Sequence, residues 1–104
     1  MSFRSVGPAS AVPEGTMKRF EVEGTALAVY HVKGVLTATE DLCTHAEAAL
    51  TDGALDCERG TVECPLHGAL FDIRTGKALC LPAITPVRTF PVKVEGDALL
   101  VDLG

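Results

Sequence analysis

Short runs of alternating apolar and polar residues make up most of this chain. The runs are rich in Val, Thr and Phe, and turn signals separate them, as at Glu23-Gly24, Lys33-Gly34 and Glu95-Gly96-Asp97. Alternation with a period of two buries one face of a strand, and glycine supplies the backbone conformations that tight turns need. The pattern therefore predicts an all-β domain of many short strands.

The expected strands lie at residues 3–7, 16–23, 26–33, 35–39, 54–57, 61–64, 70–73, 88–94 and 98–102. Only Ala46 to Leu50 has a helical pattern, about one turn long. No repeat, linker or low-complexity tract interrupts the chain, so its 104 residues are expected to form one domain, 1–104.

The composition fits a folded domain rather than a disordered one, since charged residues are 22% of the chain. The formal net charge of −5 argues against nucleic acid as a partner and suits docking on basic patches of proteins. No apolar run reaches membrane length, and MSFRSVGPAS lacks the apolar centre of a signal peptide. We expect a cytoplasmic monomer that binds no membrane.

Two short segments each combine a cysteine with a histidine: Cys43-Thr44-His45 and Cys64-Pro65-Leu66-His67. Both fall in loops between the predicted strands. A reducing compartment disfavours a disulfide framework, whereas thiolates and imidazoles are good metal ligands. The sequence therefore predicts a metal centre between these loops. Its expected ligands are Cys43, His45, Cys64 and His67.

A structural zinc site is the main alternative for this ligand set, because two cysteines and two histidines also suit tetrahedral Zn²⁺. Zinc motifs usually pair like ligands, with the cysteines in one half and the histidines in the other. Each half here is mixed. A cysteine–histidine nucleophilic pair would leave the second segment unexplained.

The other candidate residues have structural interpretations. Cys57 and Cys80 lack a second ligand at suitable spacing and are expected to be small buried side chains. His31 lies within a strand pattern and is expected to be structural. The carboxylates beside the loops are expected to be solvated: Glu40, Asp41 and Glu47.

The mixed C-x-H and C-x-x-H pattern resembles the Rieske family, in which two histidines replace two cysteines on one iron of a [2Fe–2S] cluster. The resemblance runs from about Pro13 to Asp102. The matching stretches are Pro13-Glu14-Gly15, Asp41 to His45, Cys64 to Gly68, Phe71-Asp72, Arg74-Thr75-Gly76 and Leu81-Pro82-Ala83. They are similar to the small Rieske-type ferredoxins of bacterial multicomponent aromatic-ring dioxygenases.

This resemblance implies a fold and a cofactor. The fold would be a small antiparallel β-sandwich with a cluster-binding subdomain of two loops, at about residues 40–86. The cofactor would be one Rieske-type [2Fe–2S] cluster per chain. Cys43 and Cys64 would bind its inner iron, and His45 and His67 its outer iron.

The resemblance also implies a range of reduction potential. Histidine ligation gives roughly −150 to +300 mV, against about −400 mV for plant-type ferredoxins. High-potential Rieske proteins carry an extra cysteine in each ligand loop and a serine after the second histidine. Here these positions are Ala48, Leu66 and Ala69, which implies the low end of the range.

The implied function is electron transfer without catalytic turnover. The chain would carry single electrons from a flavin-dependent NAD(P)H reductase to a Rieske-type terminal oxygenase in aromatic-compound degradation. Such an oxygenase needs two further histidines for a mononuclear iron, and this chain has only His31 left. Two alternatives remain open: a small Rieske subunit of another redox enzyme, of the nitrite reductase type, and a zinc-stabilised binding module.

Overall fold

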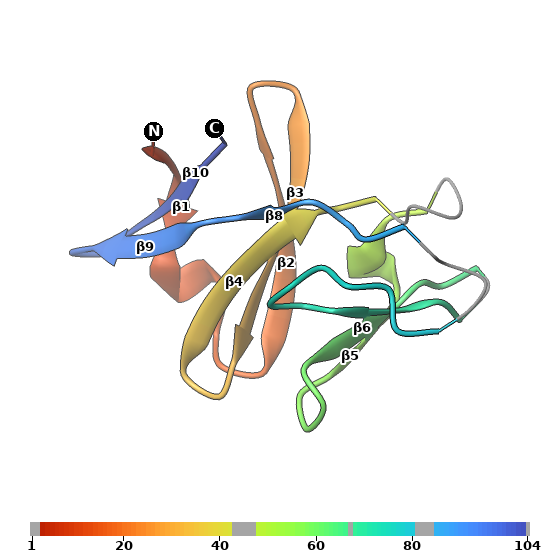
Figure 1. Cartoon of the computed structure of the whole chain (residues 1–104). Helices are drawn as coiled ribbons and strands as arrows, with labels where there is room; N and C mark the ends of the chain where they lie inside the picture. The colour runs from red at the N-terminus through yellow and green to blue at the C-terminus, as the bar shows by residue number, and fades with distance from the viewer. Residues whose placement is uncertain (1–2, 43–47, 67, 81–84, 104) are drawn as a thin grey trace.

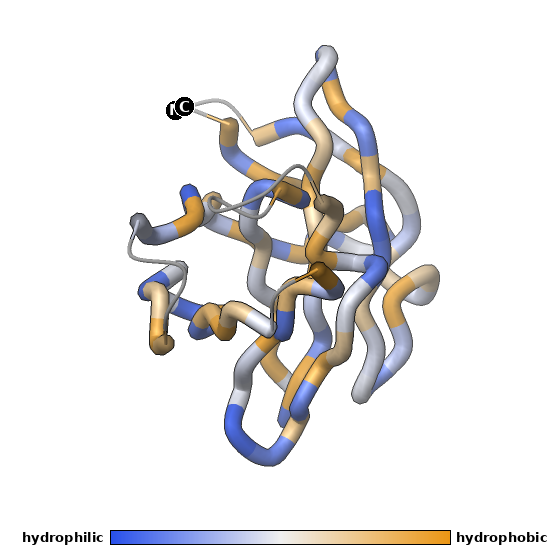
Figure 2. Tube along the Cα trace, turned by 90° about the vertical axis from the view of Figure 1, so that its right-hand side faces the viewer, coloured by the Kyte–Doolittle hydropathy of each residue, from blue (hydrophilic) through white to orange (hydrophobic). Residues whose placement is uncertain are grey.

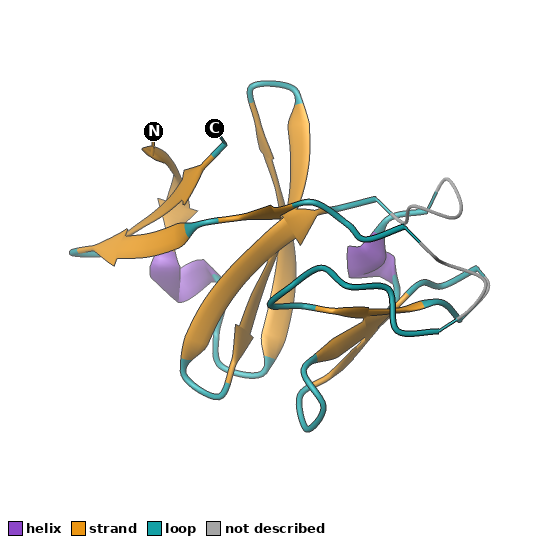
Figure 3. Cartoon of the chain, in the orientation of Figure 1, coloured by secondary structure: helices purple, strands orange, loops and turns teal. Residues whose placement is uncertain are grey.

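The computed structural model describes residues 3–42, 48–66, 68–80 and 85–103, and in them it is built almost entirely of strands (Figures 1 and 3). The strands are β1 (Phe3–Pro8), β2 (Thr16–Val22), β3 (Thr25–Val32), β4 (Val35–Glu40), β5 (Ala54–Asp56), β6 (Thr61–Glu63), β7 (Leu70–Asp72), β8 (Thr89–Phe90), β9 (Val92–Glu95) and β10 (Ala98–Asp102). Two single 3₁₀ turns, η1 (Ala9–Ala11) and η2 (Leu50–Asp52), complete the described elements. The all-β prediction is confirmed.

The strands form three antiparallel sheets, with orders β1-β10-β9, β2-β3-β4-β8 and β5-β6-β7. The β1-β10-β9 sheet and the β5-β6-β7 sheet lie on opposite sides of the four-stranded sheet (Figure 1). The β5-β6-β7 sheet shares its side of the molecule with η2. This arrangement confirms the small antiparallel β-sandwich with an attached subdomain.

Strand β3 is buried on both faces, and each face belongs to a different core. Leu27 and Val29 pack in one core, together with Phe90, Leu99 and Val101. The alternate residues of β3 pack in a second core with side chains from η2 and the β5-β6-β7 sheet: Ala28, Tyr30, Val32, Leu50, Val62, Cys64 and Phe71. The continuous apolar run of β3 follows from this double burial, whereas the Val-Lys-Val-Glu sequence of β9 alternates. Figure 2 shows how apolar and polar positions are distributed along the chain.

The hydroxyl of Tyr30 is the main polar group inside the second core. It lies 2.9 Å from Thr39 Oγ1 on β4, and Thr39 in turn donates to the Glu40 carbonyl at 2.9 Å. This chain of hydrogen bonds satisfies both hydroxyls away from water. Burial raises the pKa of Tyr30 well above its ordinary value, because the phenolate would be poorly solvated there.

The predicted glycine turns join the strands as expected. Glu23-Gly24 and Lys33-Gly34 each form a two-residue hairpin loop in which both residues have positive φ, between 51° and 81°. Such loops match the right-handed twist of the strands that they connect. The turn signals therefore set the β2–β3 and β3–β4 registers.

Two predicted boundaries are wrong. The single strand expected at 88–94 is divided at Pro91 into β8, which pairs with β4, and β9, which pairs with β10. Proline has no N–H to donate to a sheet, so the chain changes sheets at this residue. The turn expected over Ala46–Leu50 falls partly outside the described residues. Its described part is extended at Ala49, and η2 begins at Leu50.

Neither helical turn in the described residues has the length and apolar content of a membrane span.

Gly53 connects η2 to β5 and provides a test of how closely the subdomain is packed. A Cβ atom at this position would overlap the backbone oxygen of Glu63 on β6. We expect Gly53→Ala to lower the free energy of unfolding by about 1–3 kcal/mol in a denaturant titration. Gly24→Ala is the control, because a Cβ at Gly24 meets no atom within 4 Å and only its positive φ opposes alanine. A loss of less than about 1 kcal/mol in Gly53→Ala would contradict the close packing of Gly53.

Candidate metal centre

One of the four predicted ligands, Cys64, lies within the described residues, and Cys43, His45 and His67 lie outside them. Cys64 directly follows β6 and is only 1% exposed. Its N–H donates to the Ala69 carbonyl at 2.8 Å, and Gly68 N–H donates to the Cys64 carbonyl at 3.2 Å. These bonds close a tight turn around the second ligand segment, and the Cys64 thiol is free of any disulfide.

The loop that follows β7 and contains Cys80 contacts this turn. Cys80 Sγ lies 3.7 Å from the Gly68 carbonyl oxygen, a weak hydrogen bond with the thiol as donor. Gly68 itself has a φ of 70°, a conformation that favours glycine. The loop that precedes residues 81–84 is thus held against the turn that follows Cys64.

The first ligand segment is anchored at Asp41, which the sequence analysis wrongly expected to be solvated. The Asp41 side chain has no exposed surface. It accepts hydrogen bonds from Thr51 N–H at 2.8 Å, Thr51 Oγ1 at 2.6 Å and Arg19 Nη1 at 3.1 Å. The pKa of Arg19 is raised, first by its hydrogen bond to Glu21 and then by Asp41. No local pattern identifies Asp41, because Arg19 lies 22 positions away.

The described flanks of the two ligand segments contribute to one core. Leu50, which follows the first segment, and Cys64 are fully buried in the same hydrophobic cluster. Ala48 packs against that cluster from the end of the first segment. The chain therefore brings the flanks of both predicted segments together, as a centre shared between them requires.

Exposed leucines lie next to or inside the predicted segments. Leu42, directly before the first segment, is 50% exposed, and Leu66, inside the second, is 57% exposed. Leu79 is 44% exposed and precedes Cys80, whose thiol lies against Gly68. The other exposed large apolar residues in the described parts, Val35 and Val94, lie on the β3–β4 hairpin and on β9.

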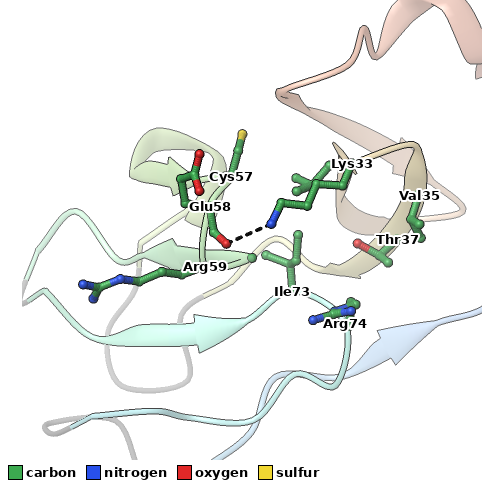
Figure 4. Close-up of a pocket in the computed structure, with 10 residues that line it drawn as sticks. Lys33, Val35, Thr37, Cys57, Glu58, Arg59, Ile73 and Arg74 are labelled. Carbon is green, nitrogen blue, oxygen red and sulfur yellow. Dashed lines mark hydrogen bonds between the residues drawn. The ribbon is translucent and has the colours of Figure 1, made fainter.

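Cys57 lies away from these segments. Its thiol donates weakly to the Gly15 carbonyl at 3.6 Å. Figure 4 shows it at a cavity of about 170 Å³ between the Lys33 turn and the β5–β6 turn, where Lys33 Nζ donates to the Glu58 carbonyl at 3.2 Å. Cys57 and Cys80 are both partly buried free thiols. Each donates a weak hydrogen bond to a backbone carbonyl. Their structural interpretation is consistent with these contacts.

His31 on β3 holds the loop that precedes β2 against the sheet. Its Nδ1 lies 2.8 Å from the Val12 carbonyl oxygen, and its Nε2 lies 3.6 Å from Glu14 Oε1. The Glu14 carboxylate also accepts from the N–H groups of Lys33 and Gly34, and the Gly34 hydrogen bond is the largest cause of its lowered pKa. The structural role expected for His31 agrees with this network.

Within the described residues, no three histidine, cysteine, aspartate or glutamate side chains converge as metal ligands. Two thiolates and two imidazoles suit an iron–sulfur centre of mixed ligation.

Comparison with known proteins gives the same result. The model of the Rieske [2Fe–2S] domain matches residues 2–91. The chain is 47% identical over 93 residues to the ferredoxin component of the naphthalene 1,2-dioxygenase system of Pseudomonas aeruginosa. The match covers 89% of this chain and 88% of that relative.

Solved structures show the same fold. The ferredoxin of carbazole 1,9a-dioxygenase from Nocardioides aromaticivorans IC177 superposes with a TM-score of 0.91 at 36% identity, covering 97% of each chain. A chain in the complex of reduced oxygenase and oxidized ferredoxin in carbazole 1,9a-dioxygenase superposes with a TM-score of 0.87 at 38% identity. That match covers 95% of this chain and 91% of the other.

The contacts of Cys57 and Cys80 lead to a prediction about the other cysteines. We expect Cys57→Ala and Cys80→Ala to leave the iron and acid-labile sulfide content of the purified protein unchanged, because each thiol is occupied with a backbone carbonyl. Metal analysis and the visible spectrum measure this content. Loss of iron from either variant would show that the ligand cysteines were assigned incorrectly.

Proposed function

The chain belongs to the Rieske [2Fe–2S] domain family, and from this membership we propose that it is the ferredoxin of a multicomponent aromatic-ring dioxygenase system. Its cofactor is a Rieske-type [2Fe–2S] cluster. When bound, this cluster accepts a single electron and releases it again. The chain is thus an electron-transfer component and leaves substrate oxidation to the terminal oxygenase.

We propose Cys43, His45, Cys64 and His67 as the ligands, and residues 40–86 as the cluster-binding part of the single domain 1–104. The burial of the free Cys64 thiol supports the assignment, because it keeps water from an inner ligand. The turn that begins at Cys64 supports it as well. Its two backbone hydrogen bonds fix the direction in which the chain continues toward His67.

The proposed partners are a flavin-dependent reductase and a Rieske-type terminal oxygenase. Support comes from the carbazole dioxygenase complex, in which a ferredoxin of the same fold is bound to its oxygenase. Leu42, Leu66 and Leu79 provide apolar contact area beside the proposed ligands. The net charge of −5 favours encounter with basic surfaces.

The similarity to named ferredoxin components favours this role over a nitrite-reductase-type subunit. The family match likewise favours an iron–sulfur cluster over a zinc-stabilised module. We place the protein in the cytoplasm as a monomer that binds neither membranes nor nucleic acid. The free thiols of Cys57 and Cys80, which are not proposed as ligands, support a reducing compartment.

Replacement of Cys64 tests the ligand assignment. We expect Cys64→Ser to be purified without iron or sulfide and to melt at a lower temperature, because cluster binding and folding of the subdomain are coupled. Metal analysis and thermal unfolding followed by circular dichroism measure the two effects. Cys57→Ser is the matched control and should keep both properties. A full iron content in Cys64→Ser would exclude Cys64 as a ligand.

Replacement of Leu66 tests the proposed contact surface. We expect Leu66→Glu to raise the KM of the terminal oxygenase for this ferredoxin about tenfold, since a loss of about 1.4 kcal/mol in binding has that effect. Val94→Glu introduces the same charge at a similarly exposed apolar position on β9 and should leave KM unchanged. Iron content should be normal in both variants. Equal KM values in the two would show that partners bind elsewhere.

A further inference from the structure

We propose that Asp41 is a positioning residue for the cluster: its buried carboxylate closes the first ligand segment at its base and lowers the reduction potential of the bound cluster. This inference rests on the proposed function, and it assigns a task to a residue that makes no contribution to the ligand set itself.

The first step is the geometry of closure. Asp41 stands two positions before Cys43. Its carboxylate accepts one hydrogen bond from Thr51 N–H at 2.8 Å and another from Thr51 Oγ1 at 2.6 Å. The bonds join the start of the segment to η2, which follows its end. Asp41 N–H also donates to the Ala26 carbonyl on β3 at 3.0 Å. One residue thus ties the loop to itself and to the central sheet.

The second step is that the described side chains inside the loop cannot replace the hydrogen bonds of Asp41. Leu42, Ala48 and Ala49, the described residues inside the loop, have side chains without hydrogen-bonding groups. Leu42 is half exposed. If Asp41 loses its bonds to Thr51, none of these residues replaces them.

The third step is charge. The donors around Asp41 all face an ionised carboxylate, and that carboxylate has no exposed surface. Its cationic partner Arg19 is 46% exposed and is shared with Glu21 at 3.2 Å, so water screens the positive charge more than the negative one. Two residues span at most about 7 Å of chain, which places this charge near Cys43. A nearby negative charge opposes the addition of an electron.

The experiment uses the purified protein with its cluster and two readouts: the rate at which a chelator removes iron, and the reduction potential by protein-film voltammetry. We expect Asp41→Asn to lose iron about tenfold faster, as is typical when a residue that supports a metal ligand is changed, and to have a higher potential. Thr51→Val should also lose iron faster, with its potential nearly unchanged. Thr51→Ser keeps the hydroxyl and should behave as the native protein.

Arg19→Gln separates charge from structure. Removal of a positive charge should lower the potential, opposite to Asp41→Asn, whereas simple loosening of the loop would move both variants in the same direction. Glu14→Gln is the matched control: Glu14 also accepts two backbone N–H groups, but on the β3–β4 hairpin, which carries no proposed ligand. It should change neither readout.

Several outcomes would overturn the proposal. If Asp41→Asn and Thr51→Val lose iron no faster than Glu14→Gln, the Asp41–Thr51 hydrogen bonds do not help to retain the cluster. If the reduction potential shifts in the same direction in Asp41→Asn and Arg19→Gln, the charge of Asp41 does not set the potential. If Asp41→Asn fails to fold, Thr51→Val and Arg19→Gln decide the two questions. A native protein that binds no iron would instead refute the proposed function.

Discussion

The double burial of β3 is the constraint on which the rest of the structure depends. A strand that packs on both faces must have sheets or loops on both sides, and β3 has the β1-β10-β9 sheet on one and the β5-β6-β7 subdomain on the other. Apolar burial is the largest favourable term in folding, so the two cores fix the positions of these layers. The hairpins on either side of β3 then hold it in the middle of its own sheet.

One proposed ligand of the metal centre belongs to one of these cores. Cys64 is at once a member of the hydrophobic cluster and a proposed ligand, and it shares that cluster with Tyr30 of β3 and Leu50 of η2. Because packed interiors resist small displacements, the thiol position is set by the core before any metal binds. Of the two described residues just before the first segment, neither Asp41 nor Leu42 belongs to that hydrophobic cluster. A buried carboxylate, Asp41, anchors the first segment there through hydrogen bonds.

Sequence patterns predict the parts of this molecule that depend on local chemistry. Alternation and glycine turns gave most strands nearly at their observed bounds, and the paired Cys-His segments led to the family. They failed where tertiary contacts decide. Pro91 divides a continuous strand pattern because β8 and β9 pair with different partners. Asp41 seemed a surface carboxylate, since Arg19 and Thr51 become its neighbours only in the folded chain. All four ligands remain predictions, although Cys64 lies buried in the core.

An electron carrier must hold its centre firmly and still present it to partners, and neighbouring residues divide these two tasks. Buried Asp41 is followed by exposed Leu42, buried Cys64 stands two residues before exposed Leu66, and half-buried Cys80 follows exposed Leu79. The buried or half-buried residue of each pair contributes to the folded structure. Each leucine leaves apolar surface in water, at a cost of about 25 cal/mol per Å². A partner that covers the leucines recovers that free energy. In the proposed contact surface, the buried side chains beside these leucines would reduce the reorganisation that docking requires.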